Sequence, residues 1–315
     1  MSVTLVGLLL PLLLELLPCL LIGYWVGGSS PGLSGRVAAP LVRYGIPVSV
    51  MGLLLKGGLS SDVLLAAVIA ALTIGITVLL SSSIPYARRC LAGPCEQLGV
   101  CVGNTAYFGV PVALALLPPE ALSISIGYDL GATLLAWSIG PLLISGGGAS
   151  DDGRWLSRVW AGLCSSPALP GLIGALLIQA TPWSDPITQI LWWPSKLVIL
   201  MALAVVGMRL GSLARGNRSV TGRLGSLLPA LISKLVLFPL LLLLIGLLLR
   251  LNPLMVQALT LQGSAPTAIS ILLIAEAVNR DQEIAAGLVF WSTIFAVLTS
   301  PLWGYLLKDL VAIQL

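Results

Sequence analysis

The chain has 315 residues, of which 57% are hydrophobic and 9% are charged, and its net charge is +4. Ordinary soluble domains contain about 25% charged residues, so this composition excludes a soluble globular protein and predicts a polytopic α-helical membrane protein. The sequence has no histidine and five cysteines. It therefore excludes a Ser-His-Asp triad and predicts no disulfide framework, no metal site, no cofactor and no enzymatic activity. Basic residues are spread among short loops, so we expect no nucleic-acid partner.

Ten stretches are long and apolar enough to cross a lipid bilayer, which takes about 20 residues per helix. The predicted spans are 4–26, 38–57, 61–83, 94–117, 121–146, 160–180, 187–211, 226–250, 254–278 and 283–308. The longest polar connection divides them into two groups of five. We expect a first five-helix repeat at 1–146, a cytoplasmic linker at 147–159 and a second five-helix repeat at 160–315.

Basic residues predict how the spans are oriented. One side carries eleven arginines, in the loops and at the adjoining span ends: Arg36, Arg43, Arg88, Arg89, Arg154, Arg158, Arg209, Arg215, Arg218, Arg223 and Arg280. The opposite side carries three basic residues: Lys56, Arg250 and Lys308. Because the more positive side of a membrane protein faces the cytoplasm, we expect both termini outside the plasma membrane. Since five is odd, the second half then enters the membrane in the opposite sense to the first.

Two apolar stretches are poorly suited to a continuous helix. The first, 99–119, contains Gly103, Asn104, Gly109 and Pro111. Proline within a helix removes an amide donor and clashes with the carbonyl four residues earlier. In lipid, such a break survives only where it faces protein or a water-filled cavity.

The second such stretch, 257–276, is interrupted at Gln262, Gly263, Ser264 and Pro266. Pro266 follows Pro111 by 155 residues (266 − 111). This layout predicts an inverted repeat whose broken spans 4 and 9 meet near the bilayer midplane, as in many secondary transporters.

A half-helix that begins near Pro111 and another that begins near Pro266 would point their amides at the breaks. Each helix start carries about half a positive charge, so two facing starts form an anion site without a metal. The side chains that could add hydrogen bonds are those of Asn104, Thr105, Tyr107, Ser264 and Thr267. The alternative is a pair of ordinary proline kinks, which membrane helices tolerate.

Ionisable residues within spans are candidates for coupling transport to an ion, because they are costly in lipid. Asp129 in span 5 is the strongest candidate, and Lys234 in span 8 and Glu15 in span 1 are others. A structural pair of Asp129 with Lys234 or Lys196 is the alternative for the aspartate. A structural hydrogen bond to a neighbouring helix is the alternative for Glu15.

Four strings resemble the auxin efflux carrier family in its broad prokaryotic sense: GNTAYFGVPVALALL at 103–117, LMALAVVGMRLGSL at 200–213, GSAPTAISILLIAEAVNRD at 263–281 and EIAAGLVFWSTIFAVLTSPLWGYLL at 283–307. The resemblance implies ten transmembrane helices in two inverted five-helix repeats, with broken helices 4 and 9 that cross at their prolines. It also implies a scaffold domain and a crossover domain, each built from both repeats, and an elevator-like movement.

The same resemblance implies an organic anion as the substrate, such as auxin in plants or a dicarboxylate in bacteria. Carried over by motif, the crossover residues are Asn104, Gly109, Pro111, Gly263, Pro266 and Thr267. Homodimerisation through the scaffold is also implied by the family. Plant members have a long central cytoplasmic loop, which the short 147–159 segment does not match.

The sequence therefore predicts a secondary active transporter that moves a small organic anion across the plasma membrane, coupled to protons or driven by the membrane potential. The alternative is a sodium-coupled symporter of the bile-acid or bicarbonate type, for which Asn104, Gln262 and Glu276 are the candidate ligands. We expect Glu276 to form a solvated pair with Arg280. An intramembrane enzyme would need paired acids, a triad or a metal cluster, and a passive channel would lack saturable counterflow.

Overall fold

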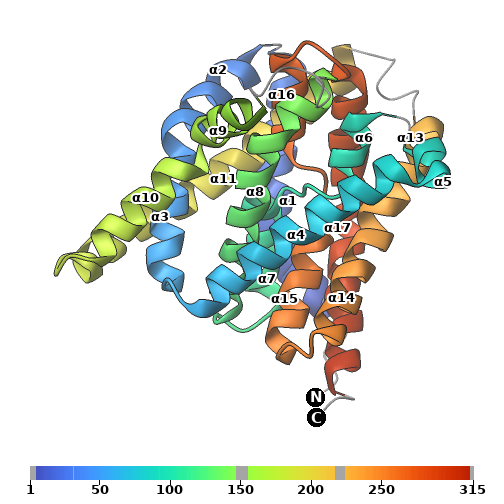
Figure 1. The fold of residues 1–315 in the computed structure, drawn as a ribbon. Coiled ribbons are helices and arrows are strands. Elements are labelled where there is room, and N and C mark those ends of the chain that lie inside the picture. The colour runs from blue at the N-terminus through green and yellow to red at the C-terminus, as the bar shows by residue number, and fades with distance from the viewer. Residues whose placement is uncertain (1–4, 31, 92, 147–154, 217–223, 313–315) are drawn as a thin grey trace.

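The computed structural model describes residues 5–30, 32–91, 93–146, 155–216 and 224–312, and side chains within these ranges except those of 5–16, 213, 216 and 309–312. These residues form helices joined by short connections (Figure 1). In chain order the helices are α1 (Leu5–Ser29), α2 (Leu33–Pro40), η1 (Leu41–Gly45), α3 (Ile46–Gly57), α4 (Ser61–Ser83), α5 (Pro85–Cys90), α6 (Pro94–Gly99), η2 (Thr105–Gly109), α7 (Val110–Leu116), α8 (Ala121–Ser145), α9 (Trp155–Ser165), α10 (Ala168–Gln179), α11 (Ser184–Gly216), α13 (Leu224–Ile232), η3 (Ser233–Leu237), α14 (Phe238–Leu248), α15 (Pro253–Gly263), α16 (Ile269–Ala277) and α17 (Gln282–Ala312).

Within the described residues, six helices are long and apolar enough to cross a membrane: Leu33–Gly57, Ser61–Ser83, Ala121–Ser145, Ser184–Ser212, Leu224–Leu248 and Gln282–Lys308. A seventh span results if α9 and α10, which meet at 69°, count as one. The predicted continuous span 160–180 is thus bent. These helices confirm an all-helical membrane protein, whereas ten spans stay a prediction.

Two of the remaining predicted spans are interrupted by extended backbone, between α6 and η2 and between α15 and α16. The first predicted span corresponds to α1, whose described side chains begin at residue 17. In the expected linker, residues 147–154 lie outside the described residues, and α9 already begins at Trp155.

In the part of the chain that the structure describes, three π-helical turns each end two residues before a proline. Pro47, Pro111 and Pro239 are the second residues of the helices that follow η1, η2 and η3. The proline ring excludes the regular hydrogen bond to the carbonyl four residues earlier, and a wider turn accommodates this loss without ending the helix. For Pro239, the carbonyl in question belongs to Leu235, and it accepts a hydrogen bond of 2.9 Å from the indole nitrogen of Trp303.

Glycines allow two pairs of helices to approach closely. A Cβ atom at Gly27 of α1 would collide with the backbone of Met208 in α11, and one at Gly211 would collide with the carbonyl of Tyr24. Gly131 of α8 lies against the carbonyl of Ala67 in α4 in the same manner. Small residues at such contacts are the usual basis of helix association in lipid, where burial of apolar surface supplies little driving force.

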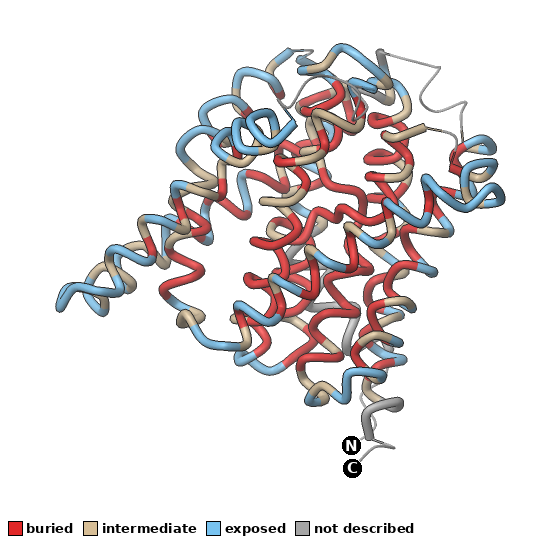
Figure 2. The backbone as a smooth tube through the Cα atoms, viewed as in Figure 1, coloured by how far each residue is buried: buried red, intermediate tan, exposed pale blue. Residues whose placement is uncertain are grey.

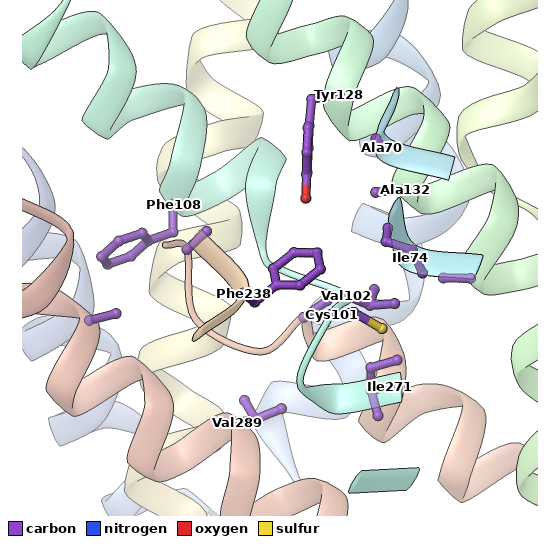
Figure 3. Packing of buried hydrophobic residues seen from close by; sticks show 14 of the residues in the cluster. Ala70, Ile74, Cys101, Val102, Phe108, Tyr128, Ala132, Phe238, Ile271 and Val289 are labelled. Carbon is purple, nitrogen blue, oxygen red and sulfur yellow. The ribbon is translucent and has the colours of Figure 1, made fainter. Parts of the chain in front are cut away.

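Buried residues concentrate where the interrupted helices meet, and the outward faces of the surrounding helices are exposed (Figure 2). In the core, Cys101 and Val102 of the first interruption lie among Phe238, Ile271 and Tyr128 (Figure 3). The exposed faces are themselves apolar: α4 alone exposes several leucines. A helix bundle in lipid requires both features, an apolar core and an apolar outer surface.

We expect Gly131→Ala to destabilise the protein, because the added methyl group must push α8 away from the Ala67 carbonyl. Overpacking of this kind costs about 1–3 kcal/mol. Thermal unfolding in detergent, followed by tryptophan fluorescence, measures the effect. The matched control is Gly75→Ala in α4, where a Cβ atom meets no atom within 4 Å and helix propensity favours alanine. Equal melting temperatures for the two variants would contradict the close packing of α4 and α8.

Candidate functional site

The two interruptions cross each other in extended conformation. Gly103 and Thr267 form an isolated antiparallel bridge. The backbone N–H of Asn104 donates to the carbonyl of Pro266 at 2.7 Å, and the N–H of Ala268 donates to the carbonyl of Val102 at 3.0 Å. Each break therefore supplies hydrogen-bond partners to the other. We call residues 100–104 and 264–268 the crossover.

The helix after the first break begins earlier than the sequence predicted. The expected start was near Pro111, but helical backbone resumes at Thr105, through η2. Asn104 precedes this turn, and its carbonyl accepts from the N–H groups of both Phe108 and Gly109. The reason is that the π-helical turn accommodates Pro111 inside the helix, so the proline does not mark the break itself.

The carboxylate of Asp129 occupies the start of this half-helix. Its Oδ1 accepts a hydrogen bond of 2.5 Å from the Thr105 hydroxyl, and the Ala106 N–H and the Thr133 hydroxyl also donate to it. The Asp129 side chain is 8% exposed. A carboxylate is favoured at a helix N-terminus because the helix dipole is positive there. One of the two helix starts expected to bind a substrate anion thus already holds an anion of the chain itself.

A cavity of about 90 Å³ lies beside the crossover and has room for several water molecules. Its walls are mostly apolar and come from the crossover and from α2, η1, α3, η2, α7, α8, α10, α11 and α16. Among the predicted site residues, the ones that line it are Asn104, Thr105, Tyr107 and Asp129. No hydrogen bond engages the Asn104 carboxamide within the described residues, so this side chain can bind a solute.

The start of α16 also borders the cavity, through Ala268, Ile269 and Ser270. Ala268 precedes the helix and gives it no side-chain cap. The first amides of a helix have no partner within that helix. The one acidic residue among the described residues that line the cavity, Asp129, lies at the start of η2. Among these cavity-lining residues, no carboxylate lies at the start of α16.

The predicted residues of the second break lie behind the cavity. The Thr267 hydroxyl donates to the carbonyl of Gly99 at 2.9 Å, and the Ser264 hydroxyl donates to that of Leu261 at 2.7 Å. Pro266 contributes its carbonyl to the crossover. Thr267 and Pro266 thus join the two breaks, whereas Ser264 bonds within its own segment. The part of these residues in substrate binding stays a prediction.

Both predicted glycines are packed against other groups. A Cβ atom at Gly109 would collide with the Gln262 carboxamide, and one at Gly263 would collide with Leu242. Neither these glycines nor Pro111 line the cavity.

Lys234 is fully buried behind the crossover, in η3. Its Nζ donates to the carbonyl of Gly263 at 3.1 Å and lies 4.9 Å from the ring centre of Phe238. Gly263 is the last residue of α15, so the ammonium group lies at the negative end of a half-helix dipole.

The suggested pairing of Asp129 with a lysine is therefore wrong. The aspartate is bonded to the hydroxyls and amide described above, Lys234 is bonded to Gly263, and Lys196 lies 4.8 Å from the ring centre of Trp192. Glu15 falls in the part of α1 whose side chains lie outside the described residues.

The expected pair between Glu276 and Arg280 is also wrong. Glu276 Oε1 is 2.6 Å from Nη1 of Arg209, and Arg280 instead donates to the carbonyl of Ser145 at 2.8 Å. The sequence places Arg209 at the inner end of span 187–211, where it counts among the arginines that set topology. In the structure α11 continues to Gly216, and Arg209 lines the cavity.

Three small polar residues of the cavity were also missed: Ser49 of α3, Thr133 of α8 and Ser270 of α16. Thr133 could have been found, because it lies one helical turn after Asp129 and so shares its face. Nothing in the sequence distinguishes Ser49 from other serines in apolar helices. Among the described residues, no cluster of three or more acidic or cysteine side chains could hold a metal ion.

Comparison with known proteins identifies the family of this chain. A sequence model of a family described as "Membrane transport protein" matches residues 55–304. The chain is 28% identical over 280 residues to an uncharacterized transporter of Methanothermobacter thermautotrophicus, covering 85% of this chain and 87% of that one. It is 24% identical over 223 residues to an uncharacterized transporter of Methanocaldococcus jannaschii, covering 68% and 70% of the two chains. The resemblance found in the motifs is thus confirmed: the chain belongs to the membrane transport proteins of the auxin efflux carrier family.

Proposed function

We propose that this transporter moves a small organic anion, a carboxylate, by an elevator-like alternating-access mechanism in the plasma membrane. The observation that carries the proposal is the crossover itself, where two broken helices exchange hydrogen bonds beside a cavity. Irregular backbone at membrane depth is tolerated where it is buried in protein or borders water. In secondary transporters, such discontinuous helices bind the substrate and the coupling ion.

The helix layout supports an inverted repeat of two five-helix units. The bridge pairs Gly103 with Thr267, an offset of 164 residues (267 − 103). Nearly the same offset relates the start of α8 to that of α17 (282 − 121 = 161). The offset of 155 taken from the two prolines is replaced by this one, because Pro111 does not lie at the break.

The distribution of charge supports a cavity that opens to the cytoplasm. Besides crossover residues, the cavity wall includes Ala38 of α2, Leu273 of α16 and Arg209 of α11. α2 and α16 lie at the end of the molecule opposite to the chain termini (Figure 1). Arg36 belongs to α2, and Arg280 follows the end of α16; positive loops stay in the cytoplasm. Both termini are then extracytoplasmic.

The geometry gives a simple basis for proton coupling. When Asp129 is ionised, its negative charge at the start of η2 repels a substrate carboxylate in the same cavity. When Asp129 binds a proton, this repulsion ends, and the Asn104 carboxamide and the first amides of α16 can receive the anion. Proton and anion then cross together. Lys234 stays behind the crossover as a fixed partner of the α15 carbonyls.

One observation favours sodium as the coupling ion instead. The Gln262 side chain is fully buried, and neither its oxygen nor its nitrogen has a hydrogen-bond partner. Carboxamide oxygens suit hard cations. However, Gln262 does not line the cavity, so a sodium ion there would lie apart from the proposed anion site. A sodium-coupled symporter is therefore the second candidate.

Uptake into proteoliposomes tests the transport class. We expect saturable accumulation of one of benzoate, malonate or malate under an inward proton gradient, with no change when choline replaces sodium. A requirement for sodium would favour the second candidate. No flux of any of these acids through folded protein would contradict the proposed function.

Asp129→Asn should separate coupling from transport, because the amide keeps the size of the side chain but cannot take up the proton. We expect accumulation driven by a proton gradient to fall to passive equilibration, while exchange of labelled for unlabelled anion continues. Asp185→Asn at the exposed start of α11 is the matched control. Undiminished proton-driven accumulation by Asp129→Asn would show that another group carries the proton.

Asn104→Ala removes a side chain that lines the cavity without an internal partner. Loss of one hydrogen bond of about 1 kcal/mol predicts an apparent affinity for the anion lower by about fivefold. Concentration dependence of initial uptake measures this change. Gln282→Ala, at an exposed carboxamide of α17, serves as the control, and an unchanged affinity for Asn104→Ala would remove Asn104 from the site.

A further inference from the structure

We propose that Arg209 binds the carboxylate of the transported anion, and that Glu276 occupies its place in the empty transporter. The inference deepens the proposed function and rests on it, because it names the residue that receives the substrate's charge. It assigns to Arg209 a role beyond the setting of topology that the sequence suggests.

The first observation is the position of the guanidinium group. Arg209 lines the cavity, and its side chain is only 14% exposed. Among the described residues of the cavity wall it is the only basic one. A buried cation in a mostly aliphatic wall is costly unless acceptors surround it. The wall therefore contains a cation that needs an anionic partner.

The second observation is that Glu276 satisfies only part of the hydrogen-bonding capacity of the Arg209 guanidinium. The ion pair joins Nη1 to Oε1 of Glu276, and the Nε–H group is buried with no hydrogen-bond partner. Arginine carries five N–H donors in a planar fork that matches the two oxygens of a carboxylate. Glu276 therefore leaves the edge that contains Nε without the partner that a bidentate carboxylate would supply.

The third observation is an unpartnered hydroxyl on the same cavity. Ser49 of α3 is 1% exposed, and its Oγ has no hydrogen-bond partner. Buried hydroxyls are nearly always bonded, so a polar ligand or water in the cavity is expected to meet it. The α16 amides at Ile269 and Ser270 border the same space. The polar groups of the wall thus include donors that suit an anion.

Glu276 is the residue that a substrate carboxylate would replace at Arg209. It is 41% exposed, so its carboxylate can move into water when a substrate carboxylate takes up the guanidinium. Two carboxylates that compete for one cation repel each other, and removal of one strengthens the binding of the other. A simple structural tie between α11 and α16 would behave differently, because loss of either partner would weaken it equally.

The test is therefore whether two substitutions change the dissociation constant of the anion in opposite directions. Binding of labelled benzoate, malonate and malate to the full-length protein in nanodiscs gives dissociation constants for each variant. We expect Arg209→Gln to weaken binding of the transported acid about tenfold or more, the loss of one charge-assisted interaction, and Arg209→Lys to recover part of it. We expect Glu276→Gln to tighten binding several-fold. Arg280→Gln is the control, since Arg280 lies outside the cavity wall and donates to the carbonyl of Ser145.

Opposite shifts for Arg209→Gln and Glu276→Gln support the proposal. Weaker binding in both, or no change in Glu276→Gln, overturns it and leaves the pair as a structural tie. If Arg209→Gln does not fold, Glu276→Gln alone still decides between tighter and unchanged binding. Wild-type protein that binds none of the acids would contradict the proposed function as well, whereas wild-type binding with unresponsive variants contradicts only the role of Arg209.

Discussion

The fold depends on one constraint: backbone groups freed by a helix break must find partners where water is scarce. An unsatisfied N–H or C=O in lipid costs several kcal/mol, and each break leaves several. The structure meets this cost by making the two breaks each other's partners, through the Gly103–Thr267 bridge and the hydrogen bonds on either side of it. Side chains complete the set, since Thr267 donates to the Gly99 carbonyl and the Ser292 hydroxyl accepts from the Thr267 amide. Neither break could exist alone, which explains why they come as a pair.

A helix break also leaves helix ends, with their partial charges, inside the protein. The two buried charged side chains at the crossover lie at helix ends of opposite sign. Asp129 lies at the positive start of η2, and Lys234 lies at the negative end of α15. Each charge is stabilised by a helix terminus, so the two do not need each other. This explains why no ion pair joins them, although a buried acid and a buried base in neighbouring spans would be expected to pair. The two side chains also have different surroundings, because Asp129 lines the cavity and Lys234 does not.

Much of this could be read from the sequence, and the failures have definite causes. The breaks were predictable because glycine, asparagine and proline cluster in otherwise apolar stretches, and Asp129 because an acid is rare within a span. The start of the helix after the first break was misplaced because a π-helical turn, which depends on local packing, carries the chain past Pro111. The partners of Lys234 and Glu276 were missed because they come from residues 29 and 67 positions away. No periodicity encodes such contacts.

Arg209 illustrates the most general of these limits. In a membrane protein, arginines near span ends determine orientation, and this role is enough to explain their presence in the sequence. A single position can nevertheless serve two purposes, because the long helix α11 carries Arg209 along the cavity wall close to its own C-terminal end. On the proposed orientation, an anion that approaches from the cytoplasm meets the same charge that orients the helix. Topology and recognition are then not separate features of the chain: the charge asymmetry that would place the cavity mouth in the cytoplasm would also make that mouth attractive to a carboxylate.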